Sequence, residues 1–412
     1  MNRITLKDCC AFQEGYVNPS QKIRDYFNGP IKWLRASDLN DGFVYNTEQT
    51  LSNKGFESAG KSAFLFNANT IAISKSGTIG RLGILKDRMC GNRAVINIDV
   101  NKQVADLFYV FYTLIYKKAE ILSKAGGSIQ KNLYVSALET ISLNHKVLTT
   151  QKSIAKVLSD LDAKIELNNR INRELEAMAK TLYDYWFVQF DFPNEQGKPY
   201  KSSGGKMVYN AELKRKIPEG WEVKKLGEYA EVKKGELITE KDTVIGNIKV
   251  VAAGVVFSYF HNAPNRKKNT ITISGSGANA GYINFWREPI FASDCITVRC
   301  NSDIETILIL QFLNFIQAHI LKQATGSAQP HVYPNDIKIL NYVVPPKNLV
   351  IKFGNIIIPM NDNIANNLKQ NQKLSELRDW LLPMLMNGQV TVKVAEERLS
   401  MAAEPSVEYK KG

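Results

Sequence analysis

The sequence predicts an α+β protein in which two similar globular domains alternate with two long helices of coiled-coil periodicity. Three observations predict this architecture. Short motifs recur about 200 residues apart, each copy mixes β-rich runs with one strong helix, and a heptad pattern follows each copy. Because this period is far too long for a solenoid repeat, the chain carries two copies of a whole module. Such an internal pseudo-dimer suits a partner with two-fold character, and duplex DNA is the commonest.

The duplication is visible at three places in the chain. The matched motifs are residues 69–74 with 269–274, Ser76-Gly77 with Ser276-Gly277, and residues 127–130 with 326–329. The first two pairs are 200 positions apart (269 − 69), and the third pair is 199 apart (326 − 127). A shift that stays this constant indicates that two complete domains are in register.

The globular domains are expected over residues 1–150 and 221–346. Apolar spacing predicts one helix from Leu107 to the Gly126-Gly127 pair, and its counterpart from Ile304 to Lys322. Runs rich in β-branched residues predict strands at 70–73, 94–98, 270–273 and 295–298.

A long helix is expected over residues 151–189 and again over residues 347–388. One heptad phase fits both. Its a positions are Ile154, Leu161, Asn168, Leu175 and Leu182, then Phe353, Met360, Asn367, Leu374 and Leu381. Its d positions include Val157, Lys164, Ile171, Met178 and Tyr185, then Ile356, Leu377 and Met384, and the e column adds Leu158, Ile165 and Ala179. Five heptads in one shared phase indicate a coiled coil, and the alternative is two amphipathic helices that each pack on their own domain.

Asn168 and Asn367 occupy the same a position near the middle of each helix. A polar residue in an apolar seam lowers stability and fixes the register of the pair. Helices that pair midpoint to midpoint bring these two amides within reach of each other, whereas on a loosely packed face each would be solvated. We therefore interpret them as register residues of the helix pair.

The segments outside these elements are polar. Residues 190–220 are rich in Pro, Gly, Ser and Lys, which is typical of a linker, and residues 389–412 form a polar C-terminal tail. The lysines of the linker are either solvated or in contact with phosphate.

Composition and charge restrict the class of protein. The chain has 53 basic and 40 acidic residues, a net charge of +13, which favours a polyanionic partner. Its start lacks a signal peptide and its longest apolar runs are too short to span a membrane, so we expect a cytoplasmic protein. Five cysteines without metal-ligand spacing predict reduced thiols and no metal site.

Motifs for catalysis are missing from the sequence. There is no Asp/Asn-Pro-Pro-aromatic tetrapeptide to hold a flipped adenine, no GxxxxGK[ST] loop for ATP and no GxSxG elbow. The glycine-rich stretch 274–281 lacks GxGxxG spacing, and its counterpart has Lys75 in place of the first glycine. We therefore predict no catalytic residue in this chain.

Two polar loops in each copy are the candidate DNA-contacting sites. Lys and Arg suit guanine or phosphate, and Asn suits adenine, so matched positions with different side chains favour two readers of different base sequences. The alternative for the first loop is an ordinary hairpin turn with glycines at positive φ. The candidates are Lys75, Ser76, Thr78, Arg81, Ser128, Gln130, Lys131 and Asn132 in the first domain, and Ser276, Asn279, Tyr282, Ser327, Gln329 and His331 in the second.

At these residues the chain resembles the specificity subunit of a type I restriction–modification enzyme, over nearly its whole length. The most specific stretches are residues 182–187 (LYDYWF), 191–193 (DFP), 217–222 (IPEGWE) and 377–388 (LRDWLLPMLMNG). The resemblance implies two target-recognition domains, each reading one half of a split, asymmetric DNA sequence. It also implies two conserved helices that pair antiparallel and act as a spacer.

The resemblance further implies partners that carry the chemistry. Two modification (methyltransferase) subunits would bind S-adenosylmethionine and methylate adenine N6, and restriction subunits would use ATP and Mg²⁺ to translocate and cut DNA. This chain would bind double-stranded DNA without a cofactor of its own. The exposed part of the helices, including Tyr183, Tyr185, Trp186 and Phe187, would dock the modification subunits, unless these rings are core residues.

Helix length agrees with a role as a spacer. About 35 helical residues span roughly 50 Å, and one turn of DNA is about 34–36 Å. We therefore expect that adding or deleting one turn of both helices changes the unspecified spacer of the target. Two rival hypotheses are a stand-alone DNA-modifying enzyme with an unrecognised site and a duplicated coiled-coil scaffold that binds protein.

Overall fold

The computed structural model describes residues 4–126, 131–144, 146–324 and 330–395. The chain divides into two compact units. Unit 1 comprises Met1–Leu167 and Gln370–Gly412, and unit 2 comprises Asn168–Lys369. Each unit contains one globular domain and part of both long helices, because each domain packs its apolar side chains against helical residues from both.

The main sheet of unit 1 has five strands in the order β1-β8-β5-β6-β3. Every side chain of β5 and β6 is buried, which explains why these strands consist of small and apolar residues. The strands are β1 Cys10–Glu14, β3 Gly42–Val44, β5 Ile71–Ser74, β6 Leu82–Leu85 and β8 Val95–Val100.

A smaller sheet in unit 1 has the order β4-β2-β7, in which β2 and β7 run parallel. Its strands are β2 Phe27–Leu34, β4 Thr50–Leu51 and β7 Cys90–Gly91. Short helical segments complete the domain: α1 Leu6–Cys9, η1 Arg24–Tyr26, η2 Ala36–Asp38, α2 Asn53–Glu57, η3 Gly60–Ser62 and α5 Val135–Glu139.

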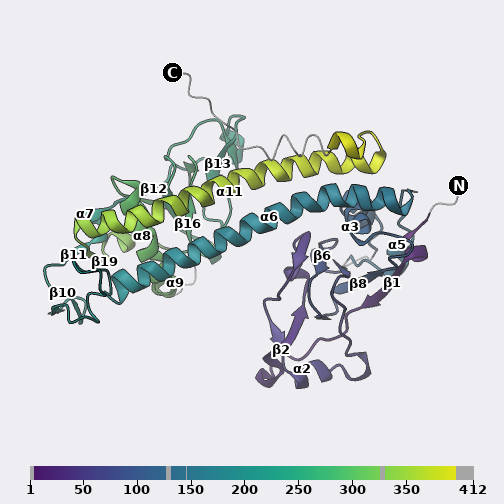
Figure 1. The fold of residues 1–412 in the computed structure, drawn as a ribbon, viewed down its shortest axis with the longest axis horizontal. Helices are drawn as coiled ribbons and strands as arrows, with labels where there is room; N and C mark the ends of the chain where they lie inside the picture. The colour runs from purple at the N-terminus through teal and green to yellow at the C-terminus, as the bar shows by residue number, and fades with distance from the viewer. Residues whose placement is uncertain (1–3, 127–130, 145, 325–329, 396–412) are drawn as a thin grey trace. The chain divides into compact units, whose positions relative to one another are not determined.

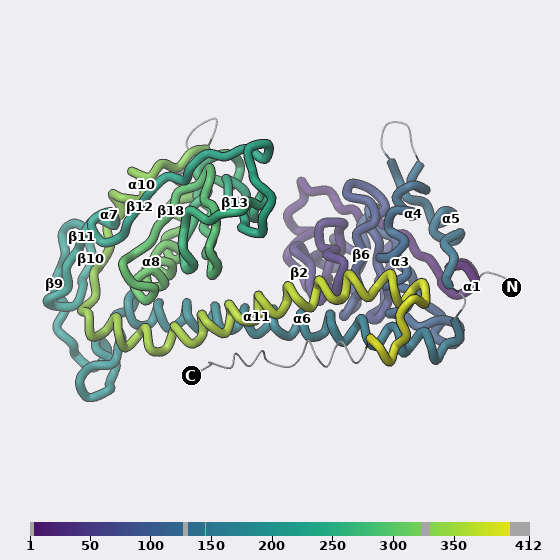
Figure 2. The backbone as a smooth tube through the Cα atoms, turned by 90° about the horizontal axis from the view of Figure 1, so that it is seen from above, coloured from purple at the N-terminus to yellow at the C-terminus, as the bar shows by residue number. Residues whose placement is uncertain are grey.

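Unit 2 repeats this arrangement with a four-stranded sheet, β12-β18-β15-β16, and a small sheet, β14-β13-β17. In this unit the helix α8 Asp303–Phe315 (Figure 2) packs against strands β15 and β16 of the main sheet. The strands are β12 Glu231–Lys234, β13 Ile248–Val251, β14 Tyr259–His261, β15 Thr270–Ser274, β16 Ile283–Trp286, β17 Phe291–Ala292 and β18 Cys295–Arg299. The remaining short elements are α7 Leu226–Tyr229, η5 Glu240–Asp242, η6 Gly277–Asn279, α10 Pro334–Lys338 and the strand pair β11 Glu222–Lys225 with β19 Asn341–Val344.

The register of the two main sheets is the same. Ile71 pairs with Ile98 in unit 1, and Ile271 pairs with Val298 in unit 2. In both units the central strand also pairs antiparallel with the strand that follows it in sequence. The predicted duplication is therefore confirmed at the level of strand pairing.

The single helix predicted after each main sheet is wrong in both units. In unit 1, α3 Leu107–Tyr116 ends at Lys117 and α4 Lys118–Ser123 follows. In unit 2, α8 Asp303–Phe315 ends at Ile316 and α9 Gln317–Ala324 follows. Both intervening residues have ψ near zero (17° and 7°), which turns the chain, and hydrophobic spacing does not detect a one-residue turn of this kind.

The two long helices are α6 Leu148–Tyr183, followed by a π turn (η4) Asp184–Val188, and α11 Lys347–Asn387 (Figure 1). In unit 2 the buried columns are a and e rather than a and d, whereas Val157 at a d position of unit 1 is buried. The d residues Ile171 and Met178 of α6 and Tyr185 of the π turn are 39%, 53% and 39% exposed, whereas the e residue Ala179 is buried. In α11, Ile356 at d is exposed and Ile357 at e is buried. The assignment of the d column to the seam is therefore wrong for these residues.

The helices pair antiparallel within unit 2. Asn367 of α11 contacts Asn172 of α6 (2.8 Å), and the ring of Phe353 lies 5.8 Å from that of Trp186. From the first contact to the second, the residue number on α6 and the turn after it rises by 14, from Asn172 to Trp186 (186 − 172). The residue number on α11 falls by 14, from Asn367 to Phe353 (367 − 353). The expected direction of pairing is thus confirmed.

The segment expected to be a linker folds in unit 2. It contains a hairpin of β9 Met207–Asn210 and β10 Arg215–Pro218, and Phe190 is 2% exposed. The ring of Phe192 stacks between Tyr200 (4.6 Å) and Trp221 (5.2 Å). The aromatic residues within a Gly- and Pro-rich composition explain this order. At the other end of the chain, the first tail residues also pack, because Ala395 is fully buried in the core of unit 1.

Candidate nucleic-acid interface

The first candidate loop of unit 1 is a hairpin turn between β5 and β6. The Ser74 amide donates to the Arg81 carbonyl (2.9 Å), and the Gly80 amide donates to the Ser74 carbonyl (3.0 Å). Gly77 and Gly80 have φ of 71° and 82°, a region that favours glycine. The turn interpretation is therefore confirmed, and it leaves the side chains of the turn available for other contacts.

The second candidate loop of unit 1 lies against the first. The Leu133 amide donates to the Lys75 carbonyl (2.8 Å), and Gly126 and Asn132 form a two-residue bridge. Lys131 is exposed and Asn132 is half-buried. Ser128 and Gln130 lie outside the described residues.

Unit 2 repeats both loops with the same backbone bonds. The Ser274 amide donates to the Tyr282 carbonyl (2.9 Å), and the Val332 amide donates to the Gly275 carbonyl (3.0 Å). Ser276 and His331 form a bridge of their own. Ser327 and Gln329 lie outside the described residues. Motifs that are about 50 residues apart in sequence are thus adjacent in both units.

The predicted side chains differ in their exposure and in whether they already have a bonding partner. Lys75 forms an ion pair with Glu14 (2.9 Å), and the Ser276 hydroxyl donates to Asp294 (3.2 Å). Thr78, Asn279 and His331 are exposed. The structure leaves Ser76, Arg81 and Tyr282 half-buried. Thr78 and Asn279 are therefore best placed to meet a ligand without breaking a side-chain contact.

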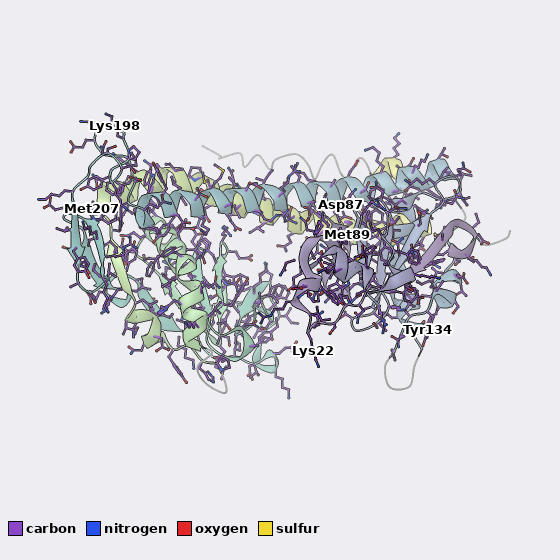
Figure 3. All side chains as sticks on the ribbon, turned by 90° about the horizontal axis from the view of Figure 1, so that it is seen from below. Lys22, Asp87, Met89, Tyr134, Lys198 and Met207 are labelled. Atoms are coloured by element: carbon purple, nitrogen blue, oxygen red, sulfur yellow. The ribbon has the colours of Figure 1, made fainter. Side chains whose placement is uncertain are left out.

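Sequence reasoning missed a matched pair of tyrosines beside these loops. Tyr134 is 53% exposed and Tyr333 is 59% exposed, and they precede α5 and α10 respectively. Figure 3 labels Tyr134, which directly precedes α5 in unit 1. In unit 2 the ring of His331 stacks on Tyr333 (5.9 Å between centroids, 17° between planes). The shared shift of 199 positions (333 − 134) is the signal that finds this pair.

Asn168 is buried and Asn367 is half-buried in the helix pair. Asn367 donates to Asn172, one turn beyond Asn168, which is itself only 1% exposed. Among the aromatic residues expected to dock a partner, Tyr183, Trp186 and Phe187 are buried in the core of unit 2. Only Tyr185 of that group remains exposed, so the core interpretation holds for the other three.

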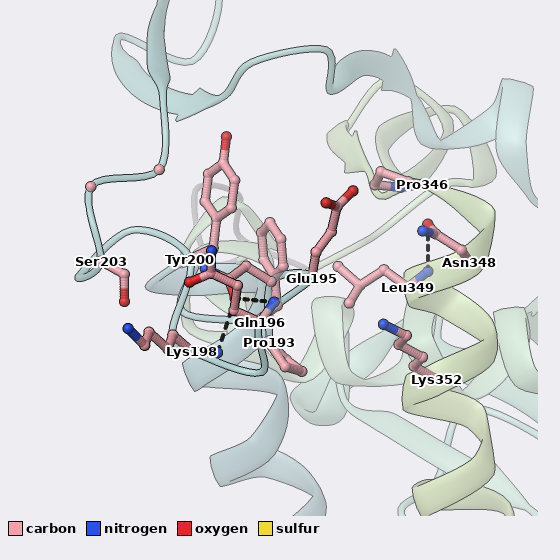
Figure 4. Close-up of a pocket in the computed structure, with 14 residues that line it drawn as sticks. Pro193, Glu195, Gln196, Lys198, Tyr200, Ser203, Pro346, Asn348, Leu349 and Lys352 are labelled. Carbon is pink, nitrogen blue, oxygen red and sulfur yellow. Dashed lines mark hydrogen bonds between the residues drawn. The ribbon is translucent and has the colours of Figure 1, made fainter.

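A separate hollow of about 830 Å³ lies in unit 2 between residues 192–205 and the start of α11 (Figure 4). Its lining includes Lys198, Lys352 and Glu195, so both signs of charge face the same space. The Asn348 side chain accepts a hydrogen bond from the Leu349 amide at the helix start. This hollow is formed by segments that carry none of the candidate loops.

Within the residues that the structure describes, no three His, Cys, Asp or Glu side chains are grouped as metal ligands. In the same part of the chain, no helix has the length and apolar character needed to cross a membrane.

Comparison with known proteins assigns this arrangement to a family. The profile of the type I restriction modification DNA specificity domain matches residues 1–177 and again residues 218–376. The chain belongs to this family. Both copies of the duplicated module are specificity domains, so the protein is a DNA specificity subunit with two recognition domains and not a catalytic subunit of a restriction enzyme.

Individual relatives agree with this assignment. The chain is 28% identical over 407 residues to the type I restriction enzyme MjaIX specificity subunit of Methanocaldococcus jannaschii, covering 92% of this chain and 91% of that protein. It is 21% identical over 372 residues to the HindI specificity subunit of Haemophilus influenzae, covering 71% and 79%. The crystal structure of the S subunit from M. genitalium aligns with a TM-score of 0.54 at 17% identity, covering 93% and 95%, and supports the fold.

Proposed function

We propose that each unit reads one half of a split DNA target through its pair of adjacent loops, residues 75–81 with 131–134 in unit 1 and residues 275–282 with 330–333 in unit 2. One observation carries this proposal. The backbone bonds that join the loops are the same in both units, at Leu133–Lys75 and at Val332–Gly275, while the exposed side chains differ. Two loop pairs with the same backbone bonds but different exposed side chains are suited to recognising two different base sequences.

The exposed side chains have the chemistry for direct contact with bases and phosphates. Lys131 in unit 1 suits guanine or phosphate, and Asn279 in unit 2 suits the paired donor and acceptor of adenine. The matched tyrosines, Tyr134 and Tyr333, add a hydroxyl and a ring beside each loop, suited to a phosphate or a sugar. Lys75 first has to leave Glu14 before it reaches DNA, so we assign it to positioning of the loop.

Docking of modification subunits is the second part of the proposal. Ile171 and Met178 on α6, and Tyr185 in the π turn that follows it, are exposed at intervals of seven residues. An apolar column with heptad spacing fits another helix, and we assign it to a modification subunit. That subunit would bind S-adenosylmethionine and methylate adenine N6, and restriction subunits would supply the ATP- and Mg²⁺-dependent steps. This chain would contribute sequence choice and assembly.

A binding experiment with base substitutions tests the loop assignment. Asn279→Ala is expected to weaken binding to the natural target and to relax base preference in one half-site only, because a bidentate base contact discriminates by about 1–3 kcal/mol. Lys131→Ala is expected to act on the other half-site. Lys152→Ala, an exposed lysine on α6, is the control. Equal loss over both half-sites for either loop variant would remove the assignment.

The two rival functions have their own tests. Transfer of labelled methyl groups to DNA by the purified chain alone would favour a stand-alone enzyme. Gel shifts over a salt series test the scaffold hypothesis, because binding through phosphates weakens by orders of magnitude as salt rises. If no shift occurs at low salt even with the modification subunit present, the duplicated domains bind protein instead.

Co-purification tests the docking column. Met178→Glu places a charge in the centre of the column and is expected to prevent assembly with the modification subunit. The variant chain alone is still expected to bind DNA weakly. Ala177→Glu, which adds the same charge at an exposed neighbouring position outside the column, is the control. Normal assembly by the Met178→Glu variant would place the modification subunit elsewhere.

A further inference from the structure

A polar junction joins each recognition domain to the two long helices, at the same position of the repeat. Asp162 on α6 and Asn361 on α11 are 199 positions apart (361 − 162), the same shift that relates the second loops. Each of them lies on the helix that follows its own domain in sequence. Each also contacts side chains of that domain, and a residue of the opposite helix joins the same group.

In unit 1 the junction is centred on a carboxylate. The Tyr112 hydroxyl of α3 donates to Asp162 Oδ2 (2.6 Å), and Arg378 of α11 donates to Asp162 Oδ1 (2.7 Å). Tyr112 is 1% exposed, and burial together with Asp162 raises the pKa of its hydroxyl. Burial lowers the pKa of Arg378, but Asp162 and the neighbouring Asp379 together more than offset this effect, so the guanidinium stays charged beside Asp162.

In unit 2 the junction is centred on an amide. Arg287, which follows β16, donates through Nε to Asn361 Oδ1 (2.8 Å) and forms an ion pair with Glu176 of α6 (3.2 Å). Asn361 is 5% exposed and the Arg287 side chain is 13% exposed. A cavity of about 600 Å³ adjoins all three residues, so close apolar packing is interrupted here.

The junction of unit 2 continues to the strand that ends at the recognition loop. The Asn361 amide nitrogen lies 3.4 Å from Asn269 Oδ1, and Asn269 in turn donates to Asp303 at the start of α8 (2.9 Å). Asn269 directly precedes β15, and the loop begins at Gly275, just after this strand. One short, buried strand therefore connects the junction to the loop.

We propose that these two junctions set the orientation in which each recognition domain presents its loops. Because the two junctions differ in chemistry, each domain fits only its own attachment point on the long helices. Unit 1 places its ion pair between the two helices, at Asp162 and Arg378. Unit 2 places its ion pair between domain and helix, at Arg287 and Glu176. A directional hydrogen bond to a buried charge fixes angle as well as distance, which apolar contacts beside a cavity do not. The proposal rests on the function of reading a split target.

The test measures methylation by the complete chain assembled with its modification subunits. Three duplexes are compared: the natural target, and targets with the spacer one base pair longer and one shorter. For Arg287→Met, which removes the donors but keeps the length of the side chain, we expect the preference for the natural spacer to fall by about tenfold. A domain held less firmly accepts half-sites in more than one position. Tyr112→Phe is expected to act in the same way through unit 1.

Two variants serve as comparisons. Asn361→Asp keeps an acceptor for Arg287 Nε and is expected to retain the spacer preference. Lys249→Met removes a different ion pair of unit 2, with Glu288 (2.6 Å), and is expected to leave the preference unchanged. Arg287→Lys keeps the charge but not the directed Nε–H. If thermal unfolding shows that Arg287→Met does not fold, the spacer preference is measured with Arg287→Lys instead, and the same loss is expected.

The spacer preference separates positioning from stability. A merely structural role lowers methylation of all three duplexes by the same factor, and that result, or no change at all, would overturn the proposal. A wild-type complex that ignores the split target would instead refute the proposed function. Failure of the junction and failure of the function are therefore distinguishable.

Discussion

Phe353 illustrates how single residues attach the long helices to the domains. Its ring is fully buried, 5.1 Å from Phe187 and 5.8 Å from Trp186. We expect Phe353→Ala to lower the free energy of unfolding by about 3–5 kcal/mol, because a cavity replaces a large buried ring. Ile351→Ala, at a side chain that is 55% exposed, is expected to change it by about 0.5 kcal/mol or less. Urea unfolding followed by circular dichroism compares the two, and equal effects would contradict the described packing.

Three buried thiols predict a pH dependence at the residue scale. Burial raises the pKa of Cys90, Cys295 and Cys300 to about 12, from an ordinary value of 9.0. Because the folded-state pKa is the higher one, each thiol contributes stability that is fully present below pH 9 and is lost as the pH rises towards 12.

Thiol labelling measures this effect directly. At pH 8 we expect these three cysteines to stay unlabelled by a disulfide reagent until the protein is unfolded in urea. Mass spectrometry of the labelled peptides identifies each site. Rapid labelling of Cys90 in the folded protein would show that its surroundings are open to solvent.

The sequence predicts the candidate loops better than the partners of single residues. Repeated motifs mark Lys75 and Lys131 as members of matched loops, and the backbone brings those loops together. The ion pair of Lys75 with Glu14 links residues far apart in sequence, and no periodic pattern predicts such a pair. Likewise, the heptad phase places Asn168 in the seam, but the contact of Asn367 with Asn172 depends on the stagger of the helices.

At the scale of elements, the seam of the long helices makes a sharp prediction for adjacent residues. Ala179 is 6% exposed, whereas Met178 is 53% exposed. Ala179→Glu buries an unpaired carboxylate, and we expect it to lower the free energy of unfolding by several kcal/mol, about 3 or more. Met178→Glu is expected to leave folding within about 0.5 kcal/mol of wild type. Thermal unfolding of both variants is the measurement, and a larger loss for Met178→Glu would restore the a and d seam.

Elements that depend on distant contacts are the ones that sequence patterns miss. Residues 190–220 have the composition of a linker, yet Phe192 is ordered by Tyr200 and by Trp221. The turns at Lys117 and Ile316 leave the apolar spacing almost unchanged, so the pattern predicts one continuous helix. Strands β5 and β15 are predicted well, because their own side chains are buried and determine their composition.

At the scale of the whole molecule, duplication separates what is shared from what is specific. The register of the main sheets and the bonds between the loops are shared by the two units. The exposed loop residues and the charges at Asp162 and Asn361 differ. A recognition domain therefore keeps its frame while its loops and its junction change, which is what two readers on one chain require.

The length of the helices gives the last prediction, for the complete subunit. Inserting four residues into α6 and four at the matched position of α11 lengthens each helix by about 6 Å, or one to two base pairs of DNA. Four residues turn the following helix by only about 40° beyond a full turn, and they move an a position onto an e position. Because this extra rotation is small, we expect the insertion to keep the helices paired. Sequencing of methylated sites in cells is expected to show both half-sites unchanged and a longer spacer between them. Methylation at the original spacer by a folded variant would show that other contacts set the interval.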